Sequence, residues 1–164
     1  MRDPKPIVGG RALLFERLVD EDHRSPGEEA RPFRAHDTRA LRESVRRELS
    51  RLLNTRCHVP TRLLAGAERD VVNYGLPDFS SLSSLSGDDC NRLGALVASA
   101  VAAFEPRLRE VRVEARRAEA AHDRTVLLRV EAVLVAGLVP EPISFRVRVK
   151  TKTGEAEVDE DGTE

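Results

Sequence analysis

Phe104-Glu105-Pro106-Arg107-Leu108 lies at the centre of the stretch that decides the fold, which runs from Asp88 to Lys152. Ahead of this centre, apolar residues recur every three or four positions, as on one face of a helix: Leu93, Leu96, Val97, Ala100, Val101 and Phe104. Behind it the apolar residues alternate with charged ones, as on a half-buried strand. Pro106 explains the change, because its ring disfavours a helical Glu105 and it has no N–H to continue the helix. We therefore expect a helix that ends near Phe104 and a helix-to-strand corner at Glu105-Pro106-Arg107.

Strand patterns follow the corner in three segments, Glu110 to Arg116, Thr125 to Ala136 and Ile143 to Thr151. A brief fourth strand is expected around Ala156 to Val158. The second segment is apolar on both faces for much of its length, which favours a central strand. The third alternates, which predicts one wet face, and its charged positions are Arg146, Arg148 and Lys150. We expect these bases to protect an open sheet edge from random pairing while leaving it accessible to an acidic partner.

Helical patterns precede the corner. A short amphipathic helix is expected over Ala12 to Val19, and a longer one over Arg39 to Leu53 with Asp37 or Thr38 as its cap. Ser86 followed by Asp89 resembles a capping box for the third helix. Because helices come first and a meander of strands comes last, the sequence predicts an α+β fold, with three helices packed on one face of an antiparallel sheet of three to four strands.

The length of 164 residues fits one soluble domain. The net charge of −1 gives the chain no overall positive potential that would attract nucleic acid or an anionic membrane. We expect a flexible N-terminal arm over residues 1–10, a single domain over 11–158 and an acidic disordered tail over 159–164, with a loop from Ser25 to His36. No apolar run is long enough for a membrane helix, and the first ten residues have no signal-peptide core. The chain is therefore expected to be cytoplasmic.

Signatures of catalysis are missing from the sequence, which has no P-loop, GxGxxG, GxSxG or HExxH motif. The four histidines are scattered through expected loops, and Cys57 and Cys90 have no CxxC spacing. We therefore expect no catalytic residue, no metal and no cofactor.

Glu105 and Arg107 are the charged pair that merits attention. Two residues apart in an extended segment, their side chains project to the same side. One interpretation is an ion pair that completes the corner; the other is a carboxylate and an arginine offered to a partner. The residues by themselves leave both interpretations open.

The pentapeptide around Pro106 resembles the Glu-Pro-Arg signature of the phage baseplate wedge family, the GPW family, which is historically labelled lysozyme-like. Other segments resemble TssE, the type VI secretion branch of that family: Leu13-Leu14-Phe15-Glu16-Arg17-Leu18, Leu52-Leu53-Asn54-Thr55-Arg56 and Tyr74-Gly75-Leu76-Pro77-Asp78. The resemblance spans roughly Ala12 to Val158.

The resemblance implies a structural, non-enzymatic baseplate subunit of a contractile injection machine. It implies attachment to the wedge proteins TssF and TssG, with TssK nearby, through a site made of Glu105, Pro106 and Arg107. It also implies a sheet that templates the sheath proteins TssB and TssC. We therefore expect the corner to present its acid and its base outward as a docking handle.

Three alternatives accompany this expectation. The family label taken literally would make the chain a peptidoglycan-cleaving glycoside hydrolase with paired carboxylates. The equivalent wedge protein of a phage tail or phage-like particle is the second. A nucleic-acid adaptor that uses the arginines of the Arg39–Leu53 helix is the third, although interleaved glutamates favour a solvated face there.

Overall fold

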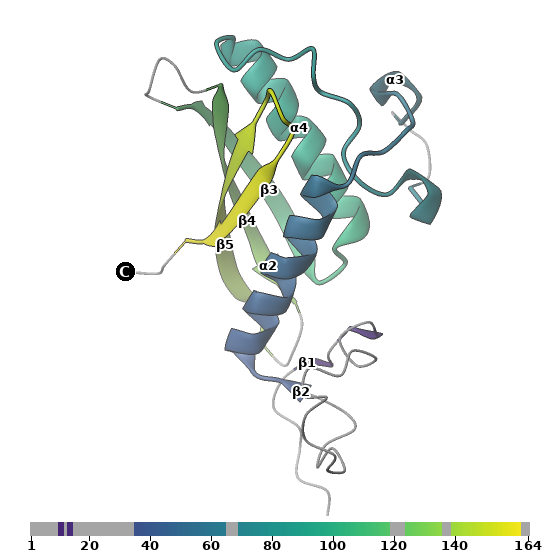
Figure 1. Cartoon of the computed structure of the whole chain (residues 1–164). Helices are drawn as coiled ribbons and strands as arrows, with labels where there is room; N and C mark the ends of the chain where they lie inside the picture. Colours follow the sequence, from purple (N-terminus) through teal and green to yellow (C-terminus); the bar gives the residue numbers. More distant parts are fainter. Residues whose placement is uncertain are drawn as a thin grey trace, which may run out of the picture.

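The computed structural model describes residues 10–11, 13–14, 35–64, 69–118, 124–135 and 139–161. Helices and strands follow one another as a two-strand pair, a helical part and a four-strand meander (Figure 1). The elements are β1 (Gly10–Arg11), β2 (Ala35–His36), α2 (Thr38–Asn54), α3 (Thr61–Leu64), the 3₁₀ turn η1 (Val71–Asn73), α4 (Gly87–Phe104), β3 (Leu108–Arg117), β4 (Thr125–Leu134), β5 (Glu141–Lys150) and β6 (Ala156–Glu160). The predicted α+β class is confirmed.

The main sheet is antiparallel with the strand order β3-β4-β5-β6. The prediction that the segment now called β4 is central is therefore confirmed. The prediction that Arg146, Arg148 and Lys150 guard an edge is wrong, because they lie on β5, between β4 and β6. Alternation identified the wet face of that strand, but a wet face can belong to an internal strand as well as to an edge.

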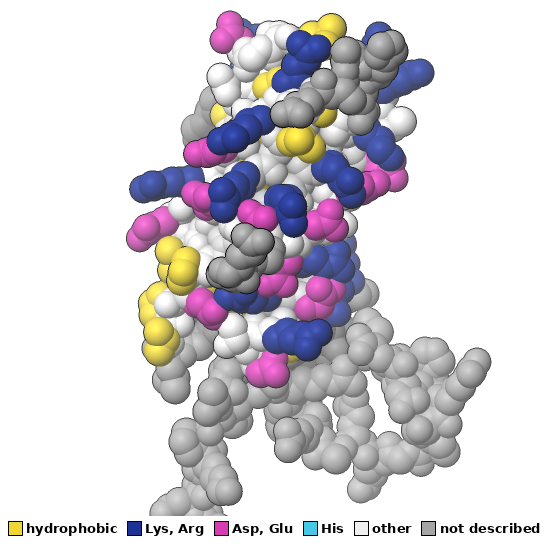
Figure 2. Space-filling model, turned by 90° about the vertical axis from the view of Figure 1, so that its left-hand side faces the viewer, with side chains coloured by type: hydrophobic (Ala, Val, Ile, Leu, Met, Phe, Trp, Pro, Cys, Tyr) yellow, Lys and Arg dark blue, Asp and Glu magenta, His cyan; other side chains and the backbone are white. Residues whose placement is uncertain are grey.

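Helices α2 and α4 cover one face of this sheet, α4 over β3 and α2 over β6 (Figure 1). Their apolar stripes and the inward side chains of the strands form one core, and its largest fully buried members include Phe145, Leu49, Leu53, Leu93 and Leu128. The opposite face of the sheet is open to solvent. Figure 2 shows basic and acidic side chains interspersed across it.

Both long helices begin as the sequence predicts. The Asp37 carboxylate accepts a hydrogen bond from the Ala40 N–H, and Ser86 Oγ accepts one from the Asp89 N–H. The return bond of a capping box does not form at α4: the Ser86 N–H donates to the Ser83 carbonyl, and the Asp89 carboxylate accepts from the Ser83 N–H. The acidic first turn of α4 thereby also fixes the end of the preceding loop.

Two boundaries differ from the expectation. Ala35 and His36, expected in a loop, pair with Gly10 and Arg11 as β2. Asp159 and Glu160, at the start of the tail expected to be disordered, instead lie in β6, and the Asp161 N–H donates to the Ser144 carbonyl; residues 162–164 lie outside the described residues. Sheet pairing and arginine neighbours hold these carboxylates in place. The expected arm and the helix at Ala12 to Val19 lie outside the described residues apart from Gly10, Leu13 and Leu14.

Candidate functional site

The corner forms where the sequence places it. Helix α4 ends at Phe104, and Glu105 is its C-cap, with its N–H donating to the Val101 carbonyl at 2.9 Å. The chain then reverses within one turn, because the Leu108 N–H donates to the Glu105 carbonyl at 3.0 Å. Pro106 lies at the exposed apex of this turn. The break in periodicity therefore marks a real change from helix to strand.

Arg107 binds the Glu105 carboxylate through two hydrogen bonds. Its Nε donates to Glu105 Oε1 at 2.7 Å and its Nη2 donates to Glu105 Oε2 at 2.6 Å. The remaining arm of the guanidinium, Nη1, donates to Ser44 Oγ on α2 at 2.8 Å. The pair thus joins the end of α4, the start of β3 and the middle of α2.

Glu105 is buried, and Arg107 is largely shielded from solvent. The side chain of Glu105 is 5% exposed and that of Arg107 is 11% exposed. The expectation that the corner presents an acid and a base outward is therefore wrong. A carboxylate at the negative end of a helix and away from water is unfavourable by itself, and the bidentate arginine compensates its charge and its lone pairs. Of the tripeptide, Pro106 is the residue that faces solvent.

Ser44 is a member of this cluster that sequence reasoning missed. It is fully buried on α2, between Leu41 and Val45 on the apolar stripe of that helix. A buried hydroxyl needs a hydrogen-bond partner, so a serine on the apolar stripe of the helix could have indicated a buried polar contact at this position. The sequence contains no indication that the partner lies 63 residues away.

An aromatic contact flanks the corner. Tyr74 meets Phe104, the last residue of α4, edge to face at 5.0 Å between ring centroids, and the Arg69 guanidinium lies 5.0 Å from the Phe104 centroid. Burial raises the pKa of Tyr74, and the charges of Glu48 and Glu105 add to this effect while Arg51 opposes it. The loop before α4 is thereby fixed against the corner.

Two segments that resemble the family, Leu52–Arg56 and Tyr74–Asp78, lie side by side in the structure. The Leu76 N–H donates to the Thr55 carbonyl at 2.9 Å, and the Cys57 N–H donates to the Leu76 carbonyl at 2.8 Å. Gly75 makes this approach possible, because a Cβ there would collide with the Thr55 carbonyl and its φ is +106°. We call these two backbone-bonded segments, Leu52–Arg56 and Tyr74–Asp78, the brace.

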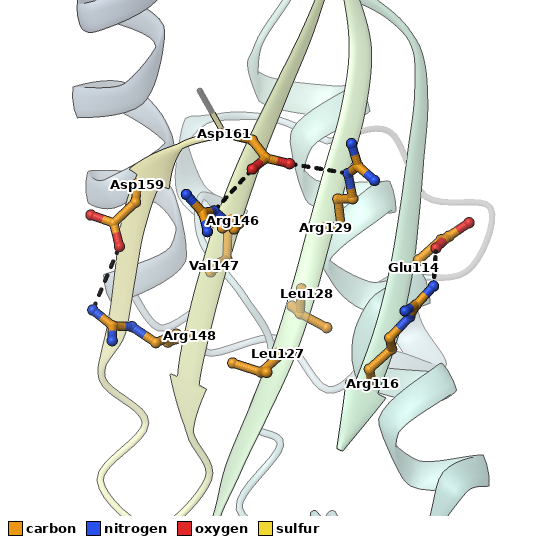
Figure 3. Close-up of a pocket in the computed structure, with 10 residues that line it drawn as sticks. All are labelled: Glu114, Arg116, Leu127, Leu128, Arg129, Arg146, Val147, Arg148, Asp159 and Asp161. Carbon is orange, nitrogen blue, oxygen red and sulfur yellow. Dashed lines mark hydrogen bonds and ion pairs between the residues drawn. The ribbon is translucent and has the colours of Figure 1, made fainter. Parts of the chain in front are cut away.

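The open face of the sheet contains a depression of about 530 Å³ (Figure 3). Side chains of all four strands line it, among them Leu127 at its floor and the bases Arg129, Arg146 and Arg148. Asp161 pairs with Arg146 at 3.0 Å and with Arg129 at 3.2 Å, while Asp159 and Glu157 pair with Arg148. The charges are mutually compensated, so the depression has no strong electrostatic preference for a ligand.

Within the described ranges, no group of three or more His, Cys, Asp or Glu side chains is placed to bind a metal ion. His58 is exposed, and the two buried thiols of Cys57 and Cys90 are free. The described helices are all too short or too polar to span a bilayer. The corner and the open face of the sheet are the candidate sites considered below.

Comparison with known proteins places this geometry in context. No curated protein sequence matches the chain. A solved structure described as "The baseplate complex from the type VI secretion system" contains a chain that aligns with a TM-score of 0.47 and 18% identity over 66% of this chain and 93% of that chain. The model of the family described as "Baseplate wedge protein gp25" matches residues 39–137, more than half of the chain, from α2 through the corner to the end of β4. The chain therefore belongs to the baseplate wedge protein gp25 family.

Proposed function

We propose that the chain is a structural subunit of a type VI secretion baseplate, equivalent to TssE. In this proposal it attaches to a wedge core of TssF and TssG, near TssK, and templates polymerisation of the sheath proteins TssB and TssC. The observation that carries the proposal is the family match over residues 39–137, because this range contains α2, α4 and the whole Glu-Pro-Arg corner. Attachment, not chemistry, is the role that this geometry supports.

The burial of Glu105 and Arg107 refines what the corner does. Groups that are 5% and 11% exposed have little surface to offer a partner. Their role in this proposal is to hold the turn, so that the exposed Pro106 and its surroundings form a fixed contact surface. A rigid surface binds with less loss of conformational entropy than a mobile one. Glu105 and Arg107 are thus positioning residues, and Pro106 makes the contact.

Co-purification with TssF and TssG from the native host tests this division of roles. Pro106→Glu places a charge at the proposed contact surface, and we expect it to lower recovery of TssF and TssG while circular dichroism shows a folded domain. Pro142→Glu makes the same change at an exposed proline on β5 and is expected to leave recovery unchanged. A folded Pro106→Glu variant that recovers both partners at the wild-type level would remove the corner from the attachment site.

The wild-type chain tests the function as a whole. We expect identified wedge and sheath proteins in the pull-down and no clearing of a peptidoglycan suspension. Recovery of phage tail proteins would assign the chain to a phage-like particle. Peptidoglycan clearing that depends on one carboxylate would replace the proposal with a hydrolase.

A further inference from the structure

The depression on the open face of the sheet has an apolar floor between two arginines. Leu127 on β4 is 39% exposed, and in the strand register it lies between Arg116 on β3 and Arg148 on β5. Figure 3 shows the two arginines on either side of this leucine. Because neighbouring strands are about 4.8 Å apart, the backbones of the two arginines lie about 10 Å from each other. A flat side chain of another protein can therefore rest on Leu127 between two guanidinium groups.

A second pair of arginines lines the depression beside this row. Arg129 on β4 and Arg146 on β5 are directly opposite each other, two residues along their strands from Leu127 and Arg148. Asp161 binds the Nε of both arginines, at 3.2 and 3.0 Å, so it offsets the repulsion between the two like charges. The depression is thus lined by four arginines, and its own carboxylates hold two of them in place.

The carboxylates of the face use the edges of these guanidinium groups. Glu114 pairs with Arg116, and Glu157 and Asp159 pair with Arg148. The N–H groups of a guanidinium lie in its plane, so an ion pair occupies the rim of the group and leaves its flat faces available for stacking. An acidic ligand would have to compete with carboxylates that are already bound. An aromatic ring needs only the faces.

The aromatic side chains of the described ranges do not occupy these faces. The Arg56 guanidinium lies over the ring of Phe79 at 4.5 Å from its centroid, and Arg69 lies over Phe104 at 5.0 Å. Both contacts belong to the helical part of the molecule. Arginine–ring stacking is therefore a contact that this fold already uses, and in the described part of the chain the arginines of the depression have no ring of their own.

We propose that the depression binds an aromatic side chain of a partner protein, with tryptophan preferred to tyrosine or phenylalanine. The ring rests on Leu127 and stacks against Arg116 and Arg148. Tryptophan is preferred because its indole attracts cations more strongly than the other two rings do. The volume of about 530 Å³ accommodates an indole, and tryptophan and arginine are the residues in which the binding energy of interfaces is concentrated.

The same surface disfavours other occupants. Carboxylates line the depression beside the arginines, so the phosphates of a nucleic acid would be repelled there although its bases are flat. A second copy of the chain has no tryptophan to insert. The depression lies toward the end of β3 that is remote from the corner, so this contact is separate from the contact at Pro106 and does not depend on the proposed function.

Three single-residue probes test the proposal on the full-length protein: N-acetyltryptophanamide, N-acetylleucinamide and the α-amide of N-acetylglutamic acid. Titration followed by amide NMR should show the tryptophan probe shifting Leu127, Arg116 and Arg148 with millimolar affinity. The other two probes should bind at least about fivefold more weakly. Nuclear Overhauser effects between the indole protons and the Leu127 methyl groups should place the ring on the floor of the depression.

The probes also define the results that would overturn the proposal. Equal binding of the tryptophan and leucine probes would show that the arginine faces contribute nothing. Tighter binding of the glutamate probe would make the occupant acidic. Shifts confined to residues outside the depression, or no shift at millimolar concentration, would remove the site. A deoxythymidine oligonucleotide that shifts the same resonances at micromolar concentration would make a nucleic acid the occupant.

Variants test the two parts of the site. Arg116→Ala combined with Arg148→Ala should lower affinity for the tryptophan probe about fivefold or more, and Leu127→Ser should also lower it. Arg112→Ala is the matched control, because Arg112 is an exposed arginine of β3 outside the depression, and it should leave the affinity unchanged. Circular dichroism checks that each variant is folded. A folded double variant that binds the tryptophan probe as well as wild type would refute stacking on these arginines.

Discussion

Arg107 and Glu105 neutralise each other inside the protein, with two hydrogen bonds of 2.7 and 2.6 Å between one guanidinium and one carboxylate. Arg107 Nη1, which does not bond to Glu105, donates to Ser44 Oγ, so helix α2 is part of the same hydrogen-bonded cluster. Through Glu105 and Arg107, the Glu-Pro-Arg tripeptide therefore forms an internal joint between helix α4 and the sheet. Its two charges fix the shape of the turn at Pro106.

Removing one partner of this pair should destabilise the fold strongly. In Arg107→Ala the Glu105 carboxylate stays buried without its counter-charge, and such losses typically cost about 3–5 kcal/mol. Urea denaturation followed by circular dichroism measures the free energy of unfolding. Arg116→Ala is the matched control, because that side chain is 80% exposed and its ion pair contributes at most about 1 kcal/mol.

The double variant Glu105→Ala with Arg107→Ala sharpens this result. Since both charges are then absent, its loss of stability should be smaller than the sum of the two single losses. Additive losses would mean that the two residues stabilise the protein independently. An Arg107→Ala protein as stable as Arg116→Ala would contradict the internal joint.

Gly75 should resist substitution because of its backbone and its neighbour. Alanine there requires a φ of +106° and places a Cβ against the Thr55 carbonyl, so Gly75→Ala should cost about 1–3 kcal/mol or more. Gly87→Ala is the matched control, since a Cβ at Gly87 meets nothing within 4 Å and alanine favours the first turn of α4. Thermal unfolding of both variants measures the difference, and equal melting temperatures would contradict the brace between Leu52–Arg56 and Tyr74–Asp78.

Asn54 should protect the β6 edge. Asn54→Ala leaves the N–H and the C=O of Ala156 without partners, which we expect to cost about 1–3 kcal/mol. It also exposes a second sheet edge, so aggregation on warming should increase. Asn91→Ala, at an exposed position on α4, should change neither the unfolding free energy nor the light scattering. Equal behaviour of the two variants would show that water replaces Asn54 at no cost.

The sequence predicts the elements better than it predicts their contacts. Pro106 and the change of period locate the corner to the residue, and double-sided apolarity identifies β4 as internal. The direction in which Glu105 and Arg107 point depends on Ser44 of α2, a partner distant in sequence, so no local pattern could reveal it. The position of a strand in the sheet is equally hidden from a local pattern. Arg146 and Arg148 would alternate with apolar residues in the same way on an edge strand or an internal strand, and only the strand order shows that their strand is internal.

Tyr74 should report on the corner through its titration. It is the single tyrosine of the chain, and the chain has no tryptophan, so phenolate absorbance belongs to this residue alone. Burial, helped by Glu48 and Glu105, raises its pKa above the usual value of 10.0. The folded protein then holds the phenolic proton more tightly than the unfolded chain does. Stability from this group is therefore complete below the unfolded pKa and is lost as the pH rises through the folded pKa.

Spectrophotometric titration of native and urea-unfolded protein measures both pKa values, and the native midpoint should be the higher. Tyr74→Phe should remove this contribution to the loss of stability at alkaline pH while keeping the edge-to-face contact with Phe104. Equal midpoints in native and unfolded protein would show that Tyr74 is solvated, and the loop before α4 would then not be packed against the corner.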